Sequence, residues 1–150
     1  MFPRERLLKE ADELIAHFLR DIRHLEPRCV IIFGSYVKGN FTESSDLDIC
    51  VISRKLPEDE ISRRNLVGVD RISKIKAIGF YPEEFLQHIK AKQLLAYDII
   101  SEGKLILDDG FYETARNLYD TCVKIMDSSK MRRDGLLEGE PRLLHEPCRQ

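Results

Sequence analysis

The stretch FGSYVKGNFTESSDLDICVIS, residues 33–53, joins a Gly-Ser pair to two aspartates across ten intervening residues. The apolar run CVIIF, residues 29–33, is typical of a short buried strand. In residues 46–53 polar and apolar side chains alternate, which predicts a second strand that carries both aspartates on one face. We therefore expect two strands separated by a loop that begins at a glycine.

The two aspartates of this stretch, Asp46 and Asp48, are candidate metal ligands. Two carboxylates held close together repel each other, and a divalent cation bound between them removes that repulsion. Oxygen ligands suit Mg²⁺ or Mn²⁺, and proteins commonly hold Mg²⁺ with one or two carboxylates together with the phosphates of a substrate.

The loop that precedes the aspartates has the features of a phosphate-binding turn. Gly34 lacks a Cβ, so backbone amides can approach a phosphate closely, and Ser35 adds a hydroxyl donor. Lys38 adds a positive charge in the same loop. A phosphate-binding turn beside a metal-binding pair is the equipment of metal-assisted transfer from a nucleoside triphosphate.

The rest of the chain predicts an α/β fold with a small sheet and helices packed against it. Helices are expected from Pro3 to about residue 25, from Pro57 to about 72, from Pro82 to about 101 and over 110–126, with further strands at 74–81 and, as a short edge strand, at 105–107. We expect one domain over residues 1–130, including its N-terminal helix, followed by an irregular tail over 131–150.

Composition and charge narrow the class of protein. With 24 basic and 26 acidic residues the net charge is −2, so no excess of positive charge indicates a nucleic-acid partner, and the pair Arg63-Arg64 is interpreted as part of a solvated face. The four cysteines are scattered, without zinc-ligand spacing, which favours a reducing cytoplasm. No apolar run approaches the roughly 18 residues of a membrane span, and the N-terminal segment predicts an amphipathic helix rather than a signal peptide.

The Gly34-Ser35 pair, ten residues and Asp46-Leu47-Asp48 together resemble the GSx₁₀DxD motif of the DNA polymerase β-like nucleotidyltransferase superfamily. The sequence of this stretch is particularly similar to those of the minimal nucleotidyltransferase (MNT) family within that superfamily. The resemblance covers residues 30–53 firmly and extends more loosely from FYPEEF (80–85) to ISEGKLILDD (100–109).

This resemblance implies a nucleotidyltransferase fold with a mixed sheet, and Mg²⁺- or Mn²⁺-dependent transfer of AMP from ATP, or of NMP from another NTP, to a hydroxyl. MNT proteins are typically encoded beside a HEPN-domain partner, and some are antitoxins that transfer AMP to it. The implied acceptor is therefore a HEPN-type protein, with a second copy of the chain as another partner that could complete the site.

Carried over to this chain, the motif assigns the triphosphate to Gly34 and Ser35 and the metal ions to Asp46 and Asp48. A third carboxylate normally lies on the following strand, near position 76, where this chain has Lys76. Without that acid, one metal ion loses a ligand and the incoming hydroxyl loses its base.

The lysine leaves three interpretations open. If the alignment is shifted by a residue or two, Asp70, Glu83 or Glu84 supplies the missing carboxylate. If it is correct, the Lys76 ammonium either pairs with Asp46 or Asp48 and replaces a metal ion electrostatically, or contacts phosphate, which gives nucleotide binding without turnover. The chain is then either an active transferase or a catalytically impaired module that binds nucleotide or a partner. A small-molecule transferase of the aminoglycoside-modifying kind is disfavoured, because those enzymes usually carry an additional substrate-binding domain.

Overall fold

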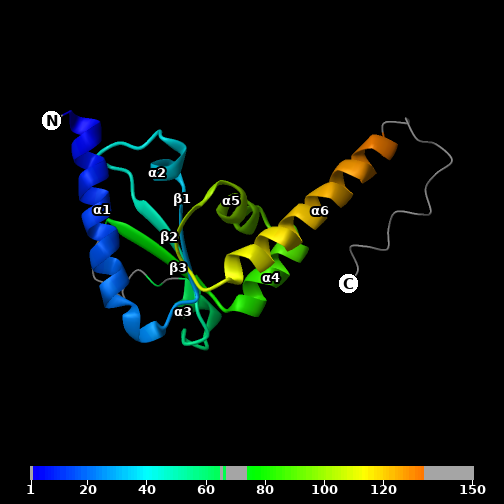
Figure 1. The fold of residues 1–150 in the computed structure, drawn as a ribbon, viewed down its shortest axis with the longest axis horizontal. Helices are drawn as coiled ribbons and strands as arrows, with labels where there is room; N and C mark the ends of the chain where they lie inside the picture. Colours follow the sequence, from blue (N-terminus) through cyan, green and yellow to red (C-terminus); the bar gives the residue numbers. More distant parts are fainter. Residues whose placement is uncertain (1, 65, 67–73, 134–150) are drawn as a thin grey trace.

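A computed structural model describes residues 2–64, 66 and 74–133 of the chain (Figure 1). At its centre is a four-stranded sheet with the strand order β3-β2-β1-β4. β1 pairs antiparallel with both β2 and β4, whereas β2 pairs parallel with β3, so the sheet is mixed. The strands are β1 (Cys29–Phe33), β2 (Leu47–Ile52), β3 (Ile75–Phe80) and β4 (Lys104–Asp108). The α/β class, the mixed sheet and the edge position of the last strand are confirmed.

Helices cover both faces of this sheet. α1 lies along one face, and α4, α5 and α6 lie on the other, with α6 extending beyond the sheet (Figure 1). The helices are α1 (Pro3–Asp21), the 3₁₀ turn η1 (Arg23–Leu25), α2 (Ser35–Lys38), α3 (Glu60–Arg64), α4 (Pro82–Lys90), α5 (Leu94–Glu102) and α6 (Phe111–Arg133). None of the helices in the described part combines the length and the apolar character of a membrane span.

The alternation of side chains along the strands builds two hydrophobic cores. On the α1 side, Val30 and Ile32 pack with Phe18, whereas Ile31 packs on the other side with the buried residues of α4 and α5. Cys50 belongs to this second core, and residues two apart on a strand share a face. Asp48 therefore lies on the face of the sheet that α4, α5 and α6 cover.

The predicted helix from Pro82 to about residue 101 is wrong, because the structure has two helices there. α4 ends at Lys90 and α5 begins at Leu94, and Lys92 between them has a positive φ of 60°. Residues 91–93 are exposed and include no glycine or proline, so the sequence carries no breaking signal at that point. Both flanking segments bury an apolar face in the same core. Their apolar residues therefore form one continuous helical pattern in the sequence, which predicted a single helix.

Several predicted boundaries also differ from the structure. α1 ends at Asp21 and is followed by the separate turn η1, and β2 begins one residue after Asp46. α3 begins at Glu60 rather than Pro57, because the Asp59 carboxylate accepts the backbone N–H of Ser62 at 2.9 Å and caps the helix there. The continuation of that predicted helix toward residue 72 lies outside the described residues.

The C-terminal part of the chain is described as far as Arg133. α6 continues seven residues beyond the predicted end at 126 and enters the first three positions of the predicted tail. The remainder of that tail, residues 134–150, lies outside the described residues. The division of the chain into a domain over 1–130 and a tail stays a prediction.

Candidate functional site

The turn between β1 and α2 is built around Gly34. Its φ of 82° and ψ of −153° define a backbone conformation that residues with a Cβ rarely adopt. A Cβ added to Gly34 would lie 2.2 Å from Oδ2 of Asp48. Glycine is thus required at this position for two reasons, its backbone conformation and its contact with Asp48. The Asp48 carboxylate lies directly against the predicted phosphate-binding turn.

The loop residues after Gly34 have different roles. Ser35 is the first residue of α2, and the Gly34 carbonyl accepts the backbone N–H groups of Val37 and Lys38 at 3.1 Å each. Tyr36 points into the core, where its ring stacks on Phe41 with centroids 4.5 Å apart. Tyr36 therefore holds the loop in place by packing.

Lys38 ends α2, and its Nζ lies 3.6 Å from Oε1 of Glu102 on α5. Both side chains are about half exposed, and ion pairs of this kind contribute little to stability. The lysine can therefore exchange this partner for a phosphate at small energetic expense. Its role in nucleotide binding stays a prediction.

The two aspartates lie at the beginning of β2. Asp46 is exposed and precedes the strand, whereas Asp48 is half-buried and is in register with Phe33 of β1 and Lys76 of β3. Burial raises the pKa of Asp48, Lys76 opposes that shift, and Asp46 adds to it. A cation bound between the two carboxylates would offset the cost of burying the Asp48 charge and would remove the repulsion between the two carboxylates.

Lys76 occupies the place beside Asp48 where the motif predicts a third carboxylate. Glu83 pairs with Arg54 and Glu84 with two arginines, so neither acid is free to replace it. Asp70 lies outside the described residues. In the part of the chain that the structure describes, no other His, Cys, Asp or Glu forms a group of three with Asp46 and Asp48 whose ligand atoms lie within 4.8 Å of one another.

These donors fit one hard cation better than two. Two carboxylates plus the phosphates of a substrate are a sufficient set for one Mg²⁺ or Mn²⁺. A second ion would need a further protein oxygen, and the position next to Asp48 offers an ammonium group instead. The oxygen ligands of Asp46 and Asp48 thus suit the expected Mg²⁺ or Mn²⁺, but the two-metal arrangement needs one more protein ligand than these residues provide.

A cavity of about 290 Å³ opens beside the half-buried aspartate. Its lining is mainly apolar, with one carboxylate and two cationic side chains; it consists of Phe33, Asp48, Arg64, Lys76, Ala77, Ile78 and Leu95. A second cavity of about 320 Å³ lies on the other face of the sheet, between α1 and the strands, and none of the predicted site residues lines it. The first cavity therefore places one predicted metal ligand, Asp48, at the wall of a space that can receive a ligand.

Arg64 in this cavity is a residue that the sequence interpretation missed. The prediction of a solvated Arg63-Arg64 pair is wrong, because Arg63 is only 7% exposed and Arg64 is held against the sheet. The Arg64 guanidinium lies over the Phe80 ring, 4.3 Å from its centroid, and donates to the Gly79 carbonyl. Only the packing of α3 on β3 brings it there, and no spacing in the sequence signals that contact.

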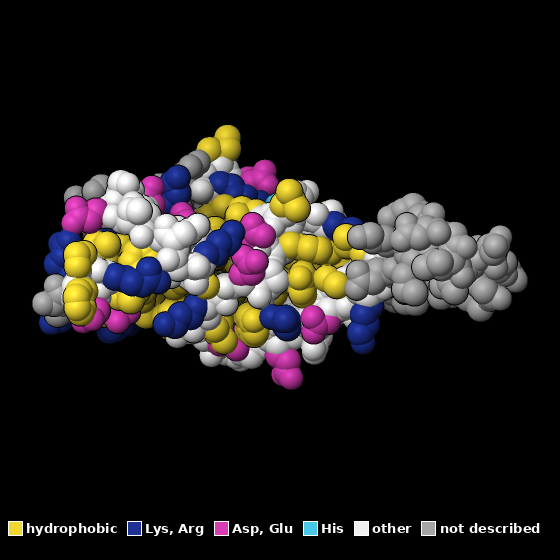
Figure 2. Space-filling view, turned by 90° about the horizontal axis from the view of Figure 1, so that it is seen from above, with side chains coloured by type: hydrophobic (Ala, Val, Ile, Leu, Met, Phe, Trp, Pro, Cys, Tyr) yellow, Lys and Arg dark blue, Asp and Glu magenta, His cyan; other side chains and the backbone are white. Residues whose placement is uncertain are grey.

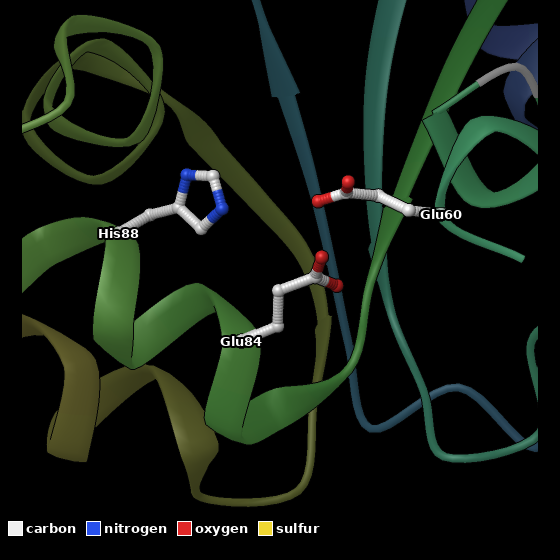
Figure 3. A group of neighbouring side chains, drawn as sticks. All are labelled: Glu60, Glu84 and His88. Atoms are coloured by element: carbon white, nitrogen blue, oxygen red, sulfur yellow. The ribbon is translucent and has the colours of Figure 1, made fainter. Parts of the chain in front are cut away.

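A group of titratable side chains, Glu60, Glu84 and His88, lies near this wall of the cavity (Figure 3). Their ligand atoms lie within 4.8 Å of one another, as a metal site would require. However, Nη2 of Arg64 lies 2.8 Å from Glu84, 3.2 Å from Glu60 and 3.1 Å from Nε2 of His88, and Arg63 donates two further hydrogen bonds to Glu84. The guanidinium of Arg64 therefore takes the place of a cation, and the group is an ion-pair network.

We expect replacement of Glu84 by Gln to lower the free energy of unfolding by about 3 kcal/mol at neutral pH. Burial alone would raise the pKa of Glu84, but hydrogen bonds from Arg63 and Arg64 lower it from 4.5 to about 2. Because the folded-state pKa is the lower one, this contribution is present above pH 4.5 and is lost as the pH falls toward 2. Urea unfolding of both proteins at several pH values measures the difference.

The control for this prediction is Glu83→Gln, because Glu83 is exposed and pairs only at the surface with Arg54. We expect it to change the free energy of unfolding by less than about 0.5 kcal/mol. A loss in the Glu84 variant no larger than that of the control would contradict the stabilising role of the network.

One face of the molecule is mixed in charge. The face seen from above carries Lys and Arg side chains interspersed with Asp and Glu, and it has no continuous basic stripe (Figure 2). A nucleic-acid-binding face typically presents such a stripe. The expectation that nucleic acid is not a partner agrees with this face and stays a prediction.

Comparison with known proteins decides the family. The family model described as "Polymerase beta, Nucleotidyltransferase" matches residues 13–110, which is more than half of the chain. The chain belongs to this nucleotidyltransferase family. The match includes the Gly34 turn, both aspartates and all four strands.

Individual relatives agree with the MNT resemblance. This chain is 28% identical over 92 residues to the Methanocaldococcus jannaschii protein named "Putative protein adenylyltransferase MJ1547", covering 56% of this chain and 63% of that one. Its fold is similar to a chain in a crystal structure of a toxin-antitoxin with AMP-PNP, with a TM-score of 0.55 and 17% identity over 80% of this chain and 94% of that chain. A mutant of the toxin-antitoxin MntA-HpeT gives a TM-score of 0.52 at 14% identity, covering 79% and 93%.

Proposed function

We propose that this nucleotidyltransferase transfers AMP from ATP, with Mg²⁺ or Mn²⁺, to a hydroxyl on a HEPN-type partner protein. The oxygen of the acceptor hydroxyl forms a bond to the α-phosphorus, and the bond from that phosphorus to the α,β-bridging oxygen breaks. Pyrophosphate leaves with that oxygen, and the proton of the hydroxyl passes to solvent water. Electrostatic neutralisation of the phosphates is the chemistry that a bound divalent cation would supply.

The observation that carries this proposal is the contact between the turn and the strand. Because the Asp48 carboxylate lies against Gly34, a phosphate bound by the backbone of the turn would be next to the carboxylates that hold its cation. Asp46 and Asp48 would hold the cation, and Gly34, Ser35 and Lys38 would bind the phosphates. Their order along the chain is that of the family motif.

The acceptor follows from the resemblance rather than from the cavity. The stretch 33–53 is similar to MNT proteins, some of which modify HEPN-type partners, and the two similar solved folds occur in toxin-antitoxin structures. The relative from M. jannaschii is named for adenylyl transfer to protein. These points favour a protein acceptor over a small molecule.

Lys76 favours a second candidate function. With an ammonium where the family has an acid, the group that would activate the acceptor hydroxyl is missing from the described residues. The chain would then bind nucleotide or its partner without turnover, and would control the partner by contact.

Label transfer separates the two functions. The protein is incubated with Mg²⁺ and ATP labelled at the α-phosphate, with and without a HEPN-type protein as the candidate acceptor. We expect label on the partner, and none from ATP labelled at the γ-phosphate, because that phosphate leaves in pyrophosphate. Absence of label combined with calorimetric binding of ATP would contradict the transferase and support the binding module.

A further inference from the structure

Lys76 differs from the cationic side chains Arg64 in the cavity and Lys38 in the turn, because those two have partners. In the described part of the chain, Lys38 pairs with Glu102, and Arg64 is held by Glu60, Glu84 and the Gly79 carbonyl. The side chain of Lys76 is exposed to the cavity and has no hydrogen bond or ion pair with any described residue. It acts on the site only through the charge that it places near Asp48.

The position of this lysine relates it directly to the proposed phosphate site. Lys76 and Asp48 are partners in the parallel ladder, and both line the same cavity. Asp48 in turn lies against Gly34 on its other side. A phosphate at the turn after β1 and the ammonium group on β3 thus approach the same carboxylate from the two strands that flank β2, within reach of a flexible lysine side chain.

The charge of the three positions changes what the site needs. Three carboxylates would carry a charge of −3, whereas Asp46, Asp48 and Lys76 together carry −1. Because a triphosphate is itself strongly anionic, a site with a charge of −3 requires two divalent cations before it can bind a triphosphate. A site with charge −1 that includes a free ammonium group requires fewer, because lysine binds phosphate as a point charge.

We propose that Lys76 binds the phosphates of the nucleotide and supplies the positive charge that a second divalent cation provides where the third carboxylate is present. This inference rests on the proposed nucleotide site and goes beyond it by assigning a phosphate-binding role to Lys76. Its consequence is that nucleotide binding depends only weakly on divalent cations.

Calorimetric titration with a non-hydrolysable ATP analogue, in Mg²⁺ and in EDTA, tests this assignment. We expect the dissociation constant of the wild-type protein to rise less than about tenfold in EDTA, since the remaining charged hydrogen bonds persist. Lys76→Met has a side chain of similar length without the charge, and we expect it to bind about tenfold more weakly in Mg²⁺ and not detectably in EDTA. Lys76→Asp is expected to bind only when Mg²⁺ is present.

Lys90→Met is the control, because Lys90 is exposed at the end of α4, outside the cavity lining. Its binding should equal that of the wild-type protein, and thermal unfolding should show that all variants are folded. Equal affinities of Lys76→Met and wild type, or complete loss of wild-type binding in EDTA, would overturn the role of Lys76 and leave the proposed function standing. Absence of binding to the wild type even in Mg²⁺ would contradict the proposed nucleotide site itself.

Discussion

Replacing Asp46 and Asp48 together by Asn is expected to reduce AMP transfer at least about 1,000-fold, because cation binding contributes several kcal/mol to transition-state stabilisation and each 1.36 kcal/mol is a factor of ten. Asparagine keeps the shape of the side chain but not the charge that holds a divalent cation. The rate of label transfer from ATP labelled at the α-phosphate measures the effect.

The stability of this double variant provides an internal control. Burial raises the pKa of Asp48, so its charge is not a source of folding stability, and its removal should leave the free energy of unfolding unchanged or higher. Glu43→Gln is the matched acid in the same loop, exposed and paired with Arg6, and it should transfer label at the wild-type rate. Label transfer by the double variant at that rate would contradict the assignment of the two aspartates.

Replacing Gly34 by Ala is expected to reduce transfer at least about 100-fold and to weaken nucleotide binding at least about tenfold, because displacement of a positioned catalytic group by about 1 Å has effects of this size. The added Cβ would lie 2.2 Å from Oδ2 of Asp48, so either the turn or the carboxylate must move. Both are parts of the proposed site. Calorimetry with the ATP analogue and the label-transfer rate measure the two losses.

Gly110→Ala is the matched control for this substitution. Gly110 has a φ of 113°, so alanine is strained there too, but nothing lies within 4 Å of the added Cβ. Gly110→Ala should lower the free energy of unfolding by about 1–2 kcal/mol, the cost of a residue with a Cβ at positive φ. Gly34→Ala should lower it by at least as much, because its Cβ also meets the Asp48 carboxylate. Only the Gly34 substitution should impair binding, and equal impairment by both would show that the contact with Asp48 has no functional role.

The core of the fold and the main site residues could be predicted because both follow from local patterns. Alternation along residues 46–53 places Asp48 on a strand, and the glycine after CVIIF marks the turn before it. Lys76 lies on the following strand in register with Asp48, and its correspondence to the third carboxylate of the motif stays a prediction. Each of these features depends on spacing within one or two elements.

Features that depend on contacts between distant elements could not be predicted in this way. No glycine or proline marks the break at residues 91–93. The break lets Ile89 of α4 and Ile99 of α5 pack into the same core from two separate helices. Arg64 enters the cavity wall through contacts with Gly79 and Glu84, 15 and 20 residues away. A sequence pattern carries no information about such partners, so the arginine was assigned to a solvated face.

The most direct test of the nucleotide site is a crystal structure of the protein with a non-hydrolysable ATP analogue and Mn²⁺, whose anomalous signal locates the ion. We predict the ion within about 2.5 Å of oxygens of Asp46 and Asp48, at metal-ligand distance, and the phosphates on the turn at Gly34 and Ser35 with the Lys76 ammonium beside them. An ion at Glu60, Glu84 and His88, or a nucleotide in the cavity beneath α1, would contradict the account.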